Sequence, residues 1–400
     1  MNDSAQARPV RDDDSAVVGD AAVTTPFLLR APLRSLHTQG CRARLPAGGT
    51  ATLAARVAAF FATPRAGLPL LVGALPFDPD ADDALHQPQA LSNAALPSAP
   101  PAATFNGRIA AEPSAAQYAD AVGTALQDLQ QPAPALHKVV LARSLLLDGA
   151  QDVDPHALAA RLGHDPSVAT YLVTLPGGPQ EPPAWLVGAT PELLVSRRGA
   201  RVLSHPLAGS ARRHPDPAED ARVAQALLAS AKDHDEHRHV VEAIVAALAP
   251  WCSHIEAEPR PSLHATATMW HLGTRIEATL ADARTPVAAL VAALHPTPAV
   301  CGTPRALALR TIRELEPVPR GFYAGAVGWT DADGDGDWYV AIRCARVQGP
   351  QVRVYAGAGI VAGSQPALEV AETDAKFGAV LNALGVDALP SIRVNGVGSR

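Results

Sequence analysis

Residues 321–361 read GFYAGAVGWTDADGDGDWYVAIRCARVQGPQVRVYAGAGIV and contain three runs of β-branched, aromatic and small apolar residues. These runs are GFYAGAVGWT, DWYVAIRCARV and QVRVYAGAGIV, and Asp, Gly and Pro separate them, which is typical of strands. The acidic segment DADGDGD has a run on each side, so it predicts a hairpin turn. This part of the chain therefore predicts a group of consecutive strands.

The rest of the chain predicts more strands in groups, with helices between the groups. Strands are expected in HKVVLARSLLLDG (137–149), TYLVTLP (170–176) and AWLVGATPELLVSRRGARVLSHPLAG (184–209). A helix is expected at 113–130, where Tyr118, Val122, Leu126 and Leu129 share one face, and further helices near 218–248 and 366–384. This grouping predicts an α+β fold rather than a regular βαβ winding.

The domain organisation follows from length and composition. The chain has 400 residues, 48% of them hydrophobic, which is enough for one large domain or two ordinary ones. Residues 1–22 and 391–400 are expected to be tails. We expect a domain over 23–390, with an N-terminal part (23–105) and a core (106–390). The Pro- and Ala-rich segment ALPSAPPAATF (95–105) is expected to be the linker or surface loop between them.

Charge, hydropathy and cysteine spacing exclude several classes of protein. The formal net charge of −6 and the lack of a basic stripe argue against nucleic-acid binding. No apolar stretch is long and uncharged enough to cross a bilayer, and the N-terminus has no signal-peptide core. The four cysteines lie far apart without a CxxC pair, which favours neither a disulfide framework nor a zinc ribbon. We therefore expect a reduced, cytoplasmic protein.

Two short motifs resemble ligand sites but fail in detail. Asp331, Asp333 and Asp335 resemble an EF-hand loop, yet Ile342 stands where the loop needs a bidentate Glu. GAGIVAG (357–363) has the spacing G-x-G-x-x-x-G instead of the dinucleotide fingerprint. We therefore expect neither calcium nor NAD at these positions, although glycines in a strand still indicate a close backbone approach.

Residues 230–245, SAKDHDEHRHVVEAIV, combine three histidines with four acidic residues. On a helix, Glu236 lies one turn before Val240 on the apolar face, where a carboxylate is costly unless it is paired or bound to a cation. Lys232 and Arg238 are expected to be more exposed. The alternative is that Glu236 stays hydrated at the helix start. The histidines lack HExxH spacing, so a zinc site is a minor alternative.

A second helical segment, ALEVAETDAKFGAVL, places Glu369, Glu372 and Lys376 on one face at spacing i, i+3, i+7. By itself this pattern also fits a surface ladder of ion pairs. Two helices that each offer a carboxylate beside an apolar stripe, however, suit a hard cation such as Mg²⁺.

Two further residues are candidates for acid–base chemistry. Lys138 begins a strand whose next residues are apolar, and a desolvated lysine could act as a base. Glu192, in GATPELLV, lies between a Gly/Pro turn and apolar residues, and burial would raise its pKa and suit it to act as an acid. The alternatives are an ordinary lysine at a strand edge and a turn carboxylate.

Taken together, these segments resemble the chorismate-utilising enzymes, and within them isochorismate synthase. The segments that carry the resemblance occur in the family's order over 138–376: KVVLARSLLL, LVGATPELLVSR, HPLAGSARR, KDHDEHRHVV, LHPTPAVCGTP, GFYAGAVGW, VAIRCARV, VYAGAGIV and EVAETDAK. The resemblance implies a single chorismate-binding catalytic domain like anthranilate synthase component I, with stacked, mostly antiparallel sheets surrounded by helices. It also implies Mg²⁺-dependent, reversible conversion of chorismate to isochorismate.

The resemblance also implies roles for individual residues. Lys138 matches the general base that activates water for attack at C2, and Glu192 matches the acid that protonates the departing C4 hydroxyl. Glu236 and Glu372 match Mg²⁺ ligands, with Glu369 close by, directly or through water. The remaining matches are to positions that contact the substrate: Gly209, Ser210, Ala299, Arg343, Gly357 and Lys376.

Two alternatives remain open within this resemblance. One is a salicylate synthase or another chorismate-converting lyase, although AGSARR and HPTPAV favour isochorismate synthase. The other is a protein that binds chorismate without turnover. The expected partner is chorismate, with no nucleic acid and no membrane, and the expected assembly is a monomer. The product could feed siderophore or menaquinone synthesis.

Overall fold

The computed structural model describes residues 26–64, 66–92, 99, 101–133, 135–178 and 180–386. The tails predicted at 1–22 and 391–400 lie outside the described residues, as do residues 95–98 and 100 of the linker predicted at 95–105.

Helices occupy the three segments that the sequence predicts to be helical, and the described residues form further helices that were not predicted. The described helices are α1 (Leu53–Ala62), α2 (Ala115–Leu129), α3 (Pro155–Leu162), α4 (Pro217–Ala229), α5 (Ala231–Leu248), α6 (Val287–Leu294), α7 (Arg305–Leu315) and α8 (Pro366–Ala383), with a 3-10 turn at Thr50–Thr52. The predicted apolar face of α2 is buried, and Ser114 forms a capping box with Gln117 at its start.

Strands occupy the β-branched and apolar runs that predict them, and the described residues form further strands that were not predicted. The described strands are β1 (Phe27–Arg30), β2 (Leu36–Arg44), β3 (Leu70–Leu75), β4 (Ala84–Leu91), β5 (Gly107–Glu112), β6 (Lys138–Gly149), β7 (Ala169–Leu175), β8 (Ala184–Thr190), β9 (Leu193–Arg198), β10 (Arg201–His205), β11 (Leu207–Arg212), β12 (Cys252–Ala257), β13 (Ser262–Ala265), β14 (Met269–Gly273), β15 (Ile276–Leu280), β16 (Gly302–Thr303), β17 (Ala326–Asp331), β18 (Gly336–Val340), β19 (Cys344–Gln348) and β20 (Gln351–Ile360).

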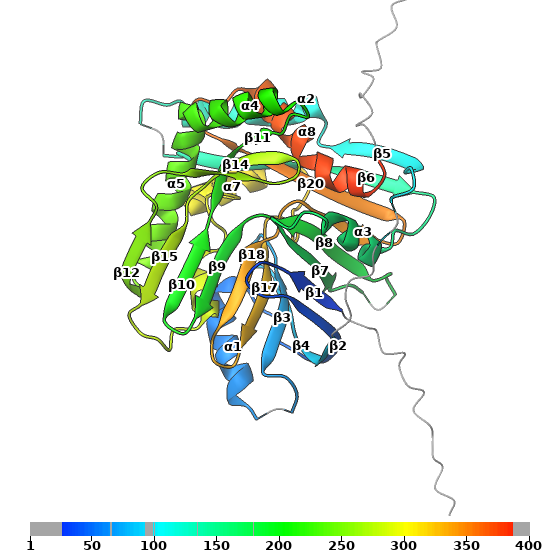
Figure 1. The fold of residues 1–400 in the computed structure, drawn as a ribbon, viewed down its shortest axis with the longest axis vertical. Coiled ribbons are helices and arrows are strands. Elements are labelled where there is room, and N and C mark those ends of the chain that lie inside the picture. The colour runs from blue at the N-terminus through cyan, green and yellow to red at the C-terminus, as the bar shows by residue number, and fades with distance from the viewer. Residues whose placement is uncertain are drawn as a thin grey trace, which may run out of the picture.

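The strand pairings among the described residues are antiparallel. They form one continuous series, in the order β5–β6–β20–β19–β8–β7–β1–β2–β4–β3–β17–β18–β9–β10–β15–β12. A smaller sheet pairs β11, β14 and β13. In Figure 1, β5, β6 and β20 run across the upper part of the molecule, and β3, β17, β18, β9 and β10 fan out below them. The predicted α+β class with layered antiparallel sheets is therefore confirmed.

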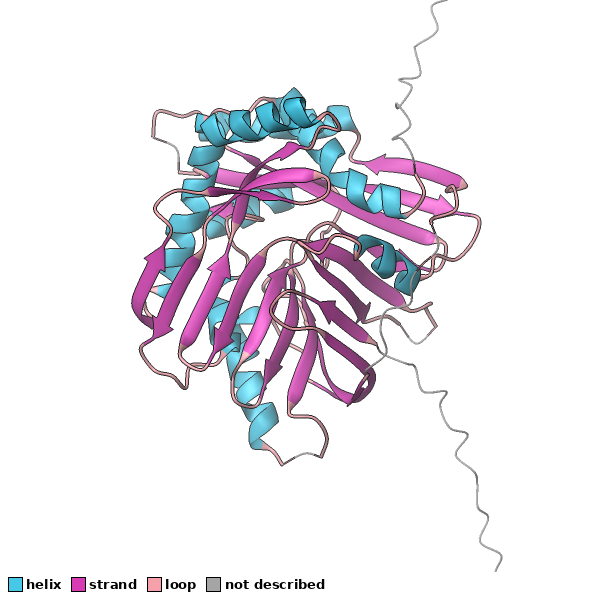
Figure 2. Ribbon diagram, in the orientation of Figure 1, coloured by secondary structure: helices cyan, strands magenta, loops and turns pink. Residues whose placement is uncertain are grey.

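Helices cover the sheet series on its outer sides, as Figure 2 shows for the upper layer. Helix α8 packs on β20 and against α2. Because helices and strands cover both faces of β20, its residues 354–360 are buried without alternation. Strand β20, which carries Gly357 and Gly359, is therefore held against β6, which carries Lys138.

One expected strand is interrupted. The run DWYVAIRCARV divides into β18 and β19, and Arg343 between them has a φ of +53°. The reason is topological, because β18 pairs with β17 and β9 whereas β19 pairs with β20 and β8. The chain must turn between the two parts of the sheet, and the turn places Arg343 at the site described below.

The expected helical region at 218–248 likewise divides into two helices. Ser230 has extended backbone (φ −73°, ψ 111°), and its hydroxyl accepts a hydrogen bond from the Asp233 amide at 3.2 Å. This capping bond starts α5 at a fixed point and therefore fixes which of its side chains face inward.

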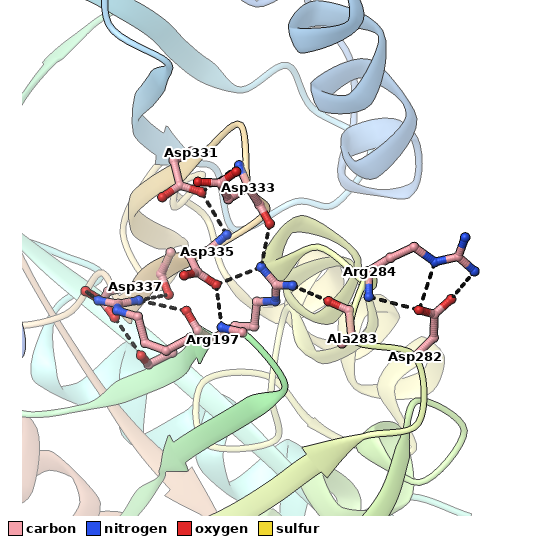
Figure 3. A network of polar contacts seen from close by, with 12 residues as sticks. Arg197, Asp282, Ala283, Arg284, Asp331, Asp333, Asp335 and Asp337 are labelled. Carbon is pink, nitrogen blue, oxygen red and sulfur yellow. Dashed lines mark hydrogen bonds and ion pairs between the residues drawn. The ribbon is translucent and has the colours of Figure 1, made fainter.

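The acidic turn at 331–337 is a hairpin turn, as predicted. Strands β17 and β18 pair on its two sides, from Ala326 with Val340 to Thr330 with Gly336. The Asp331 carboxylate accepts backbone hydrogen bonds from Asp333 and Asp335, and Arg197 donates to Asp335 Oδ1 at 2.7 Å (Figure 3). The turn's carboxylates therefore bind its own backbone and an arginine.

Candidate active site

The residues predicted for the site come together around one cavity. The cavity measures about 60 Å³, and its lining includes Glu192, Gly209, Ser210, Glu236, Ala299, Arg343, Gly357 and Lys376. A volume of this order holds a few water molecules. A wider cavity of about 510 Å³ shares Pro191, His271 and Arg343 with it and so adjoins the site. The other three predicted residues, Lys138, Glu369 and Glu372, connect to this lining through ion pairs.

Lys138 is fully buried at the start of β6, and its Nζ lies 3.0 Å from Glu236 Oε1. Glu236 is 5% exposed on the inner side of α5, so the alternative of a hydrated carboxylate is wrong. Gly359 of β20 makes this pair possible. A Cβ at Gly359 would lie 2.0 Å from Glu236 Oε1 and 3.0 Å from Lys138 Cε. Gly359 belongs to the GAGIVAG segment, which does not have the dinucleotide spacing. Its missing side chain leaves the space that the Lys138–Glu236 pair occupies.

Replacement of Gly359 by alanine tests this packing. The added methyl must push away the Glu236 carboxylate, which is the flexible end of a side chain, so the main effect falls on the site. We expect turnover to fall by about 100-fold, the cost of displacing a catalytic group by roughly 1 Å. Steady-state kinetics on the variant, with its melting temperature recorded in parallel, measures the effect.

Gly123→Ala is the matched control for this substitution. Gly123 lies within α2, and a Cβ added there meets nothing within 4 Å. It should leave turnover unchanged and stabilise the helix by about 0.5–1 kcal/mol. Unaltered turnover in Gly359→Ala would show that the Lys138–Glu236 geometry does not matter for the reaction.

Three carboxylates from two helices face the same point. Glu236 belongs to α5, and Glu369 and Glu372 belong to the first two turns of α8. The Nζ of Lys232 lies among them, 3.1 Å from Glu369 Oε1 and 3.9 Å from both Glu236 Oε2 and Glu372 Oε2. Lys232 is more exposed than Glu236, as expected, but its side chain is only 24% exposed because these ion pairs hold it inward. The same expectation is correct for Arg238, which is about half exposed.

The carboxylates fit an oxygen-binding divalent cation by their chemistry. The buried Glu236 Oε2 has no hydrogen-bond partner, an unusual state for a carboxylate oxygen inside a protein. Carboxylates without nitrogen or sulfur ligands suit Mg²⁺. Among the residues that the structure describes, however, no three His, Cys, Asp or Glu side chains already stand at metal-binding spacing. The three glutamates surround an ammonium group and would have to close further around a smaller ion.

The two glutamates of α8 differ in their surroundings. Burial raises the pKa of Glu369 despite the nearby Lys232. Burial would also raise the pKa of Glu372, but Lys376 and Lys232 outweigh it and lower that pKa. Lys376 Nζ lies 2.6 Å from Glu372 Oε1, and the Ser210 hydroxyl donates to the same oxygen at 3.0 Å. Glu372 is therefore the more strongly stabilised anion.

Glu192 lies between β8 and β9, 3% exposed. Burial raises the pKa of Glu192 to about 8, although Lys138, Lys376 and Arg343 act in the opposite direction. The carboxyl group is therefore mainly protonated at neutral pH, as a proton donor requires. This agrees with the expectation that burial raises its pKa, while its role in a reaction stays a prediction.

The residues predicted to contact substrate also support one another. Lys376 Nζ donates to the carbonyl of Gly357 at 2.8 Å, which fixes the ammonium group at the cavity wall. Arg343 is 8% exposed, and burial lowers its pKa to about 10, so it stays charged at neutral pH. Its Nη2 donates to His271 Nε2 at 3.5 Å.

Sequence reasoning missed several residues of this site. His271 lines both cavities, and burial, together with Arg343, lowers the pKa of its ring well below the usual value, so it is a neutral acceptor. The stacked rings of Tyr323 and Tyr355, with centroids 4.9 Å apart, line the same cavity. No local pattern in the sequence marks these three residues, because distant strands bring them together.

The histidines of the α5 stretch serve the fold. His237 is buried, with Nδ1 donating to the Ala208 carbonyl at 3.2 Å and Nε2 accepting from the Thr274 hydroxyl at 2.7 Å. It thereby holds α5 against β11, next to Gly209 and Ser210.

All four cysteines are free, in agreement with the sequence prediction.

The fold and the site together define a protein with a buried, polar cavity whose lining includes a lysine, an arginine and two carboxyl groups. Residues 76–385 match the model of the chorismate binding enzyme family, and the chain belongs to that family.

The relatives of this chain include proteins named as isochorismate synthases. Isochorismate synthase DhbC of Bacillus subtilis is 49% identical over 254 residues, which are 63% of this chain and 64% of that protein. The putative isochorismate synthase MenF of Mycobacterium tuberculosis is 44% identical over 380 residues, 93% of this chain and all of that protein. The crystal structure of a putative 2,3-dihydroxybenzoate-specific isochorismate synthase, DhbC from Bacillus anthracis, superimposes with a TM-score of 0.85. The two sequences are 39% identical, and the match covers 91% of this chain and 97% of the Bacillus anthracis chain.

Proposed function

We propose that this protein is an isochorismate synthase that converts chorismate to isochorismate reversibly, with Mg²⁺ as cofactor. The observation that carries the proposal is the meeting of one buried lysine, one buried glutamate with a raised pKa and three carboxylates in and beside a single pocket. The names of its relatives at 44–49% identity support the same reaction. The cytoplasmic location and the monomeric state expected from the sequence belong to this proposal as well.

The proposed reaction needs a base on one side of the ring and an acid on the other. Lys138 must first lose the proton of its ammonium form. As the neutral amine it takes a proton from the water that attacks C2, and Glu192 gives a proton to the C4 hydroxyl as it departs along the allylic system. A protonated Glu192 carries no charge beside a dianionic substrate until it gives up its proton. Arg343 and Lys376 bind the substrate carboxylates, so that a protein with net charge −6 presents a positive pocket.

The metal would bind to Glu236, Glu372 and Glu369, directly or through water. Bound there, Mg²⁺ supplies a positive anchor for the ring carboxylate. The Ser210 hydroxyl and the Lys376 ammonium orient Glu372, and Lys138 and Gly359 orient Glu236. The support for this assignment is the partnerless oxygen of Glu236 and the oxygen-only set of side chains.

The pH profile tests the assignment of Glu192. Because its pKa is raised to about 8, the proton donor is present below that pH and is lost as the pH rises through it. We expect kcat/KM to fall about tenfold per pH unit above pH 8. Glu192→Gln should lose most of the activity, and the remaining activity should lack this alkaline limb. A kcat/KM that stays constant from pH 7 to pH 10 in the wild-type protein would contradict the role of Glu192.

Product analysis tests the proposed reaction itself. Purified protein incubated with chorismate and Mg²⁺ should yield isochorismate, identified by chromatography. Salicylate together with pyruvate would replace the proposal by a lyase reaction. Saturable binding of chorismate without any product would indicate a binding protein. Neither the siderophore nor the menaquinone pathway is favoured by the site, and a gene for an isochorismatase beside this one would indicate the former.

A further inference from the structure

The place of Lys232 in the helix does not by itself explain where its side chain lies. It is the second residue of α5, where the helix dipole disfavours a cation. Its Nζ nevertheless points to Glu369, Glu236 and Glu372 at 3.1, 3.9 and 3.9 Å. Burial opposes the charge on Lys232, but the three carboxylates outweigh it and raise its pKa above the usual value. The ammonium group is therefore the counterion of the whole cluster.

The composition of the chain points to the same place. The sequence contains thirty arginines but only three lysines, Lys138, Lys232 and Lys376. Each of the three lies within 4 Å of a carboxylate of the same cluster, through the ion pairs with Glu236, Glu369 and Glu372. A chain that uses arginine at all its other cationic positions retains lysine only here. A compact ammonium on a flexible stem, rather than a planar guanidinium, is what this cluster requires.

A divalent ion and this ammonium group exclude each other. Mg²⁺ binds carboxylate oxygens at 2.0–2.1 Å. An ion shared by these glutamates would lie almost where Nζ lies, with like charges in near contact. The stem of Lys232 has room to withdraw, because it is partly exposed and even a Cβ placed at the neighbouring Gly363 would remain 3.9 Å from its Cγ.

We propose that Lys232 is a resident cation of the metal site: its ammonium group is shared by Glu236, Glu369 and Glu372 in the metal-free protein and is displaced when Mg²⁺ binds. The inference rests on the proposed metal site. It accounts for the finding that the described part of the chain holds no preassembled metal-binding spacing, because the carboxylates are spaced for an ammonium group. It also means that the affinity for Mg²⁺ is set lower than three converging carboxylates alone would give, since the ion must replace a bound cation.

The test compares Mg²⁺ binding and thermal unfolding in wild-type protein and Lys232→Met, without substrate. In EDTA the variant should melt at a lower temperature, because three buried carboxylates lose their shared counterion. In isothermal titration the variant should bind Mg²⁺ more tightly, by roughly tenfold or more, within the usual range for coupled equilibria. Mg²⁺ should therefore raise the melting temperature of the variant more than that of the wild type.

Arg238→Met is the matched control, since it removes a cation from the same helix. Arg238 pairs with Asp235 and Glu242 on the exposed side. It should change neither the affinity for Mg²⁺ nor its effect on melting. If Lys232→Met does not fold, crystal structures of the wild type in EDTA and in Mg²⁺ decide the matter. The Nζ of Lys232 should contact Glu369 in the crystals grown in EDTA, and it should lie out of contact with Glu369 in the Mg²⁺-bound crystals.

The outcomes separate this inference from the proposed cofactor. If the wild type binds Mg²⁺ and Lys232→Met binds it equally or more weakly, Lys232 is not a competitor and the inference is wrong. A Lys232 that still contacts Glu369 in a Mg²⁺-bound crystal structure has the same meaning. If the wild type binds no Mg²⁺, or if Glu236→Gln does not reduce the Mg²⁺ binding of the wild type, the proposed metal site itself fails. The displacement then fails with it.

Discussion

Replacement of Lys138 by methionine is expected to lower kcat by on the order of 10²- to 10⁴-fold, the contribution of a general base. The side chain is completely buried, and methionine has a similar shape without a basic group. Its Nζ contacts Glu236 Oε1 at 3.0 Å, so a cation is lost from the carboxylate cluster while the carboxylates remain. Mg²⁺ binding should therefore be largely retained. Single-turnover kinetics, with isothermal titration of Mg²⁺ on the same sample, measures both properties.

The arginine variant at this position separates basicity from charge. Arginine keeps a positive charge beside Glu236 but does not give up a proton in proteins. Lys138→Arg should therefore be as inactive as Lys138→Met. Near-normal turnover in either variant would show that Lys138 is not the base, and a selective rescue by arginine would assign it an electrostatic role instead.

Replacement of Glu236 by glutamine is expected to weaken Mg²⁺ binding by at least roughly 10- to 100-fold, the range seen even for residues that only support a metal ligand. Turnover should fall in parallel at low Mg²⁺ and recover in part at high Mg²⁺. The reason is that glutamine keeps the volume and one oxygen but removes the negative charge. In the wild type, EDTA should abolish turnover, and added Mg²⁺ should restore it.

Glu242→Gln is the matched control on the same helix. Glu242 is largely exposed and pairs with Arg238. It should leave both Mg²⁺ affinity and turnover unchanged. Equal Mg²⁺ affinity in Glu236→Gln and the wild type would remove Glu236 from the metal site. Full turnover of the wild type in EDTA would remove the metal from the reaction.

Local patterns in the sequence predict the strands and helices that carry most of the site, although α1, α3, α6, α7 and several strands were not predicted. Alternation and composition place β6, β7 and β20, and the apolar stripe of α2 is buried as its spacing requires. The errors lie at boundaries, where DWYVAIRCARV divides at Arg343 and the helical region divides at Ser230. Pairing with two different parts of the sheet causes the first break, and no local propensity encodes it.

The sequence itself determined the type of each side chain at the site and, through helix spacing, that Glu236, Glu369 and Glu372 face the same way as apolar neighbours. Its three lysines among thirty arginines also carried a signal that points to the cluster. The tertiary structure alone decided that Lys138 meets Glu236 and Lys232 meets Glu369, and that Lys232 turns inward against the preference of its helix end. The physical reason is that an ion pair between residues 137 positions apart depends on how two helices pack, and only the assembled core fixes that packing.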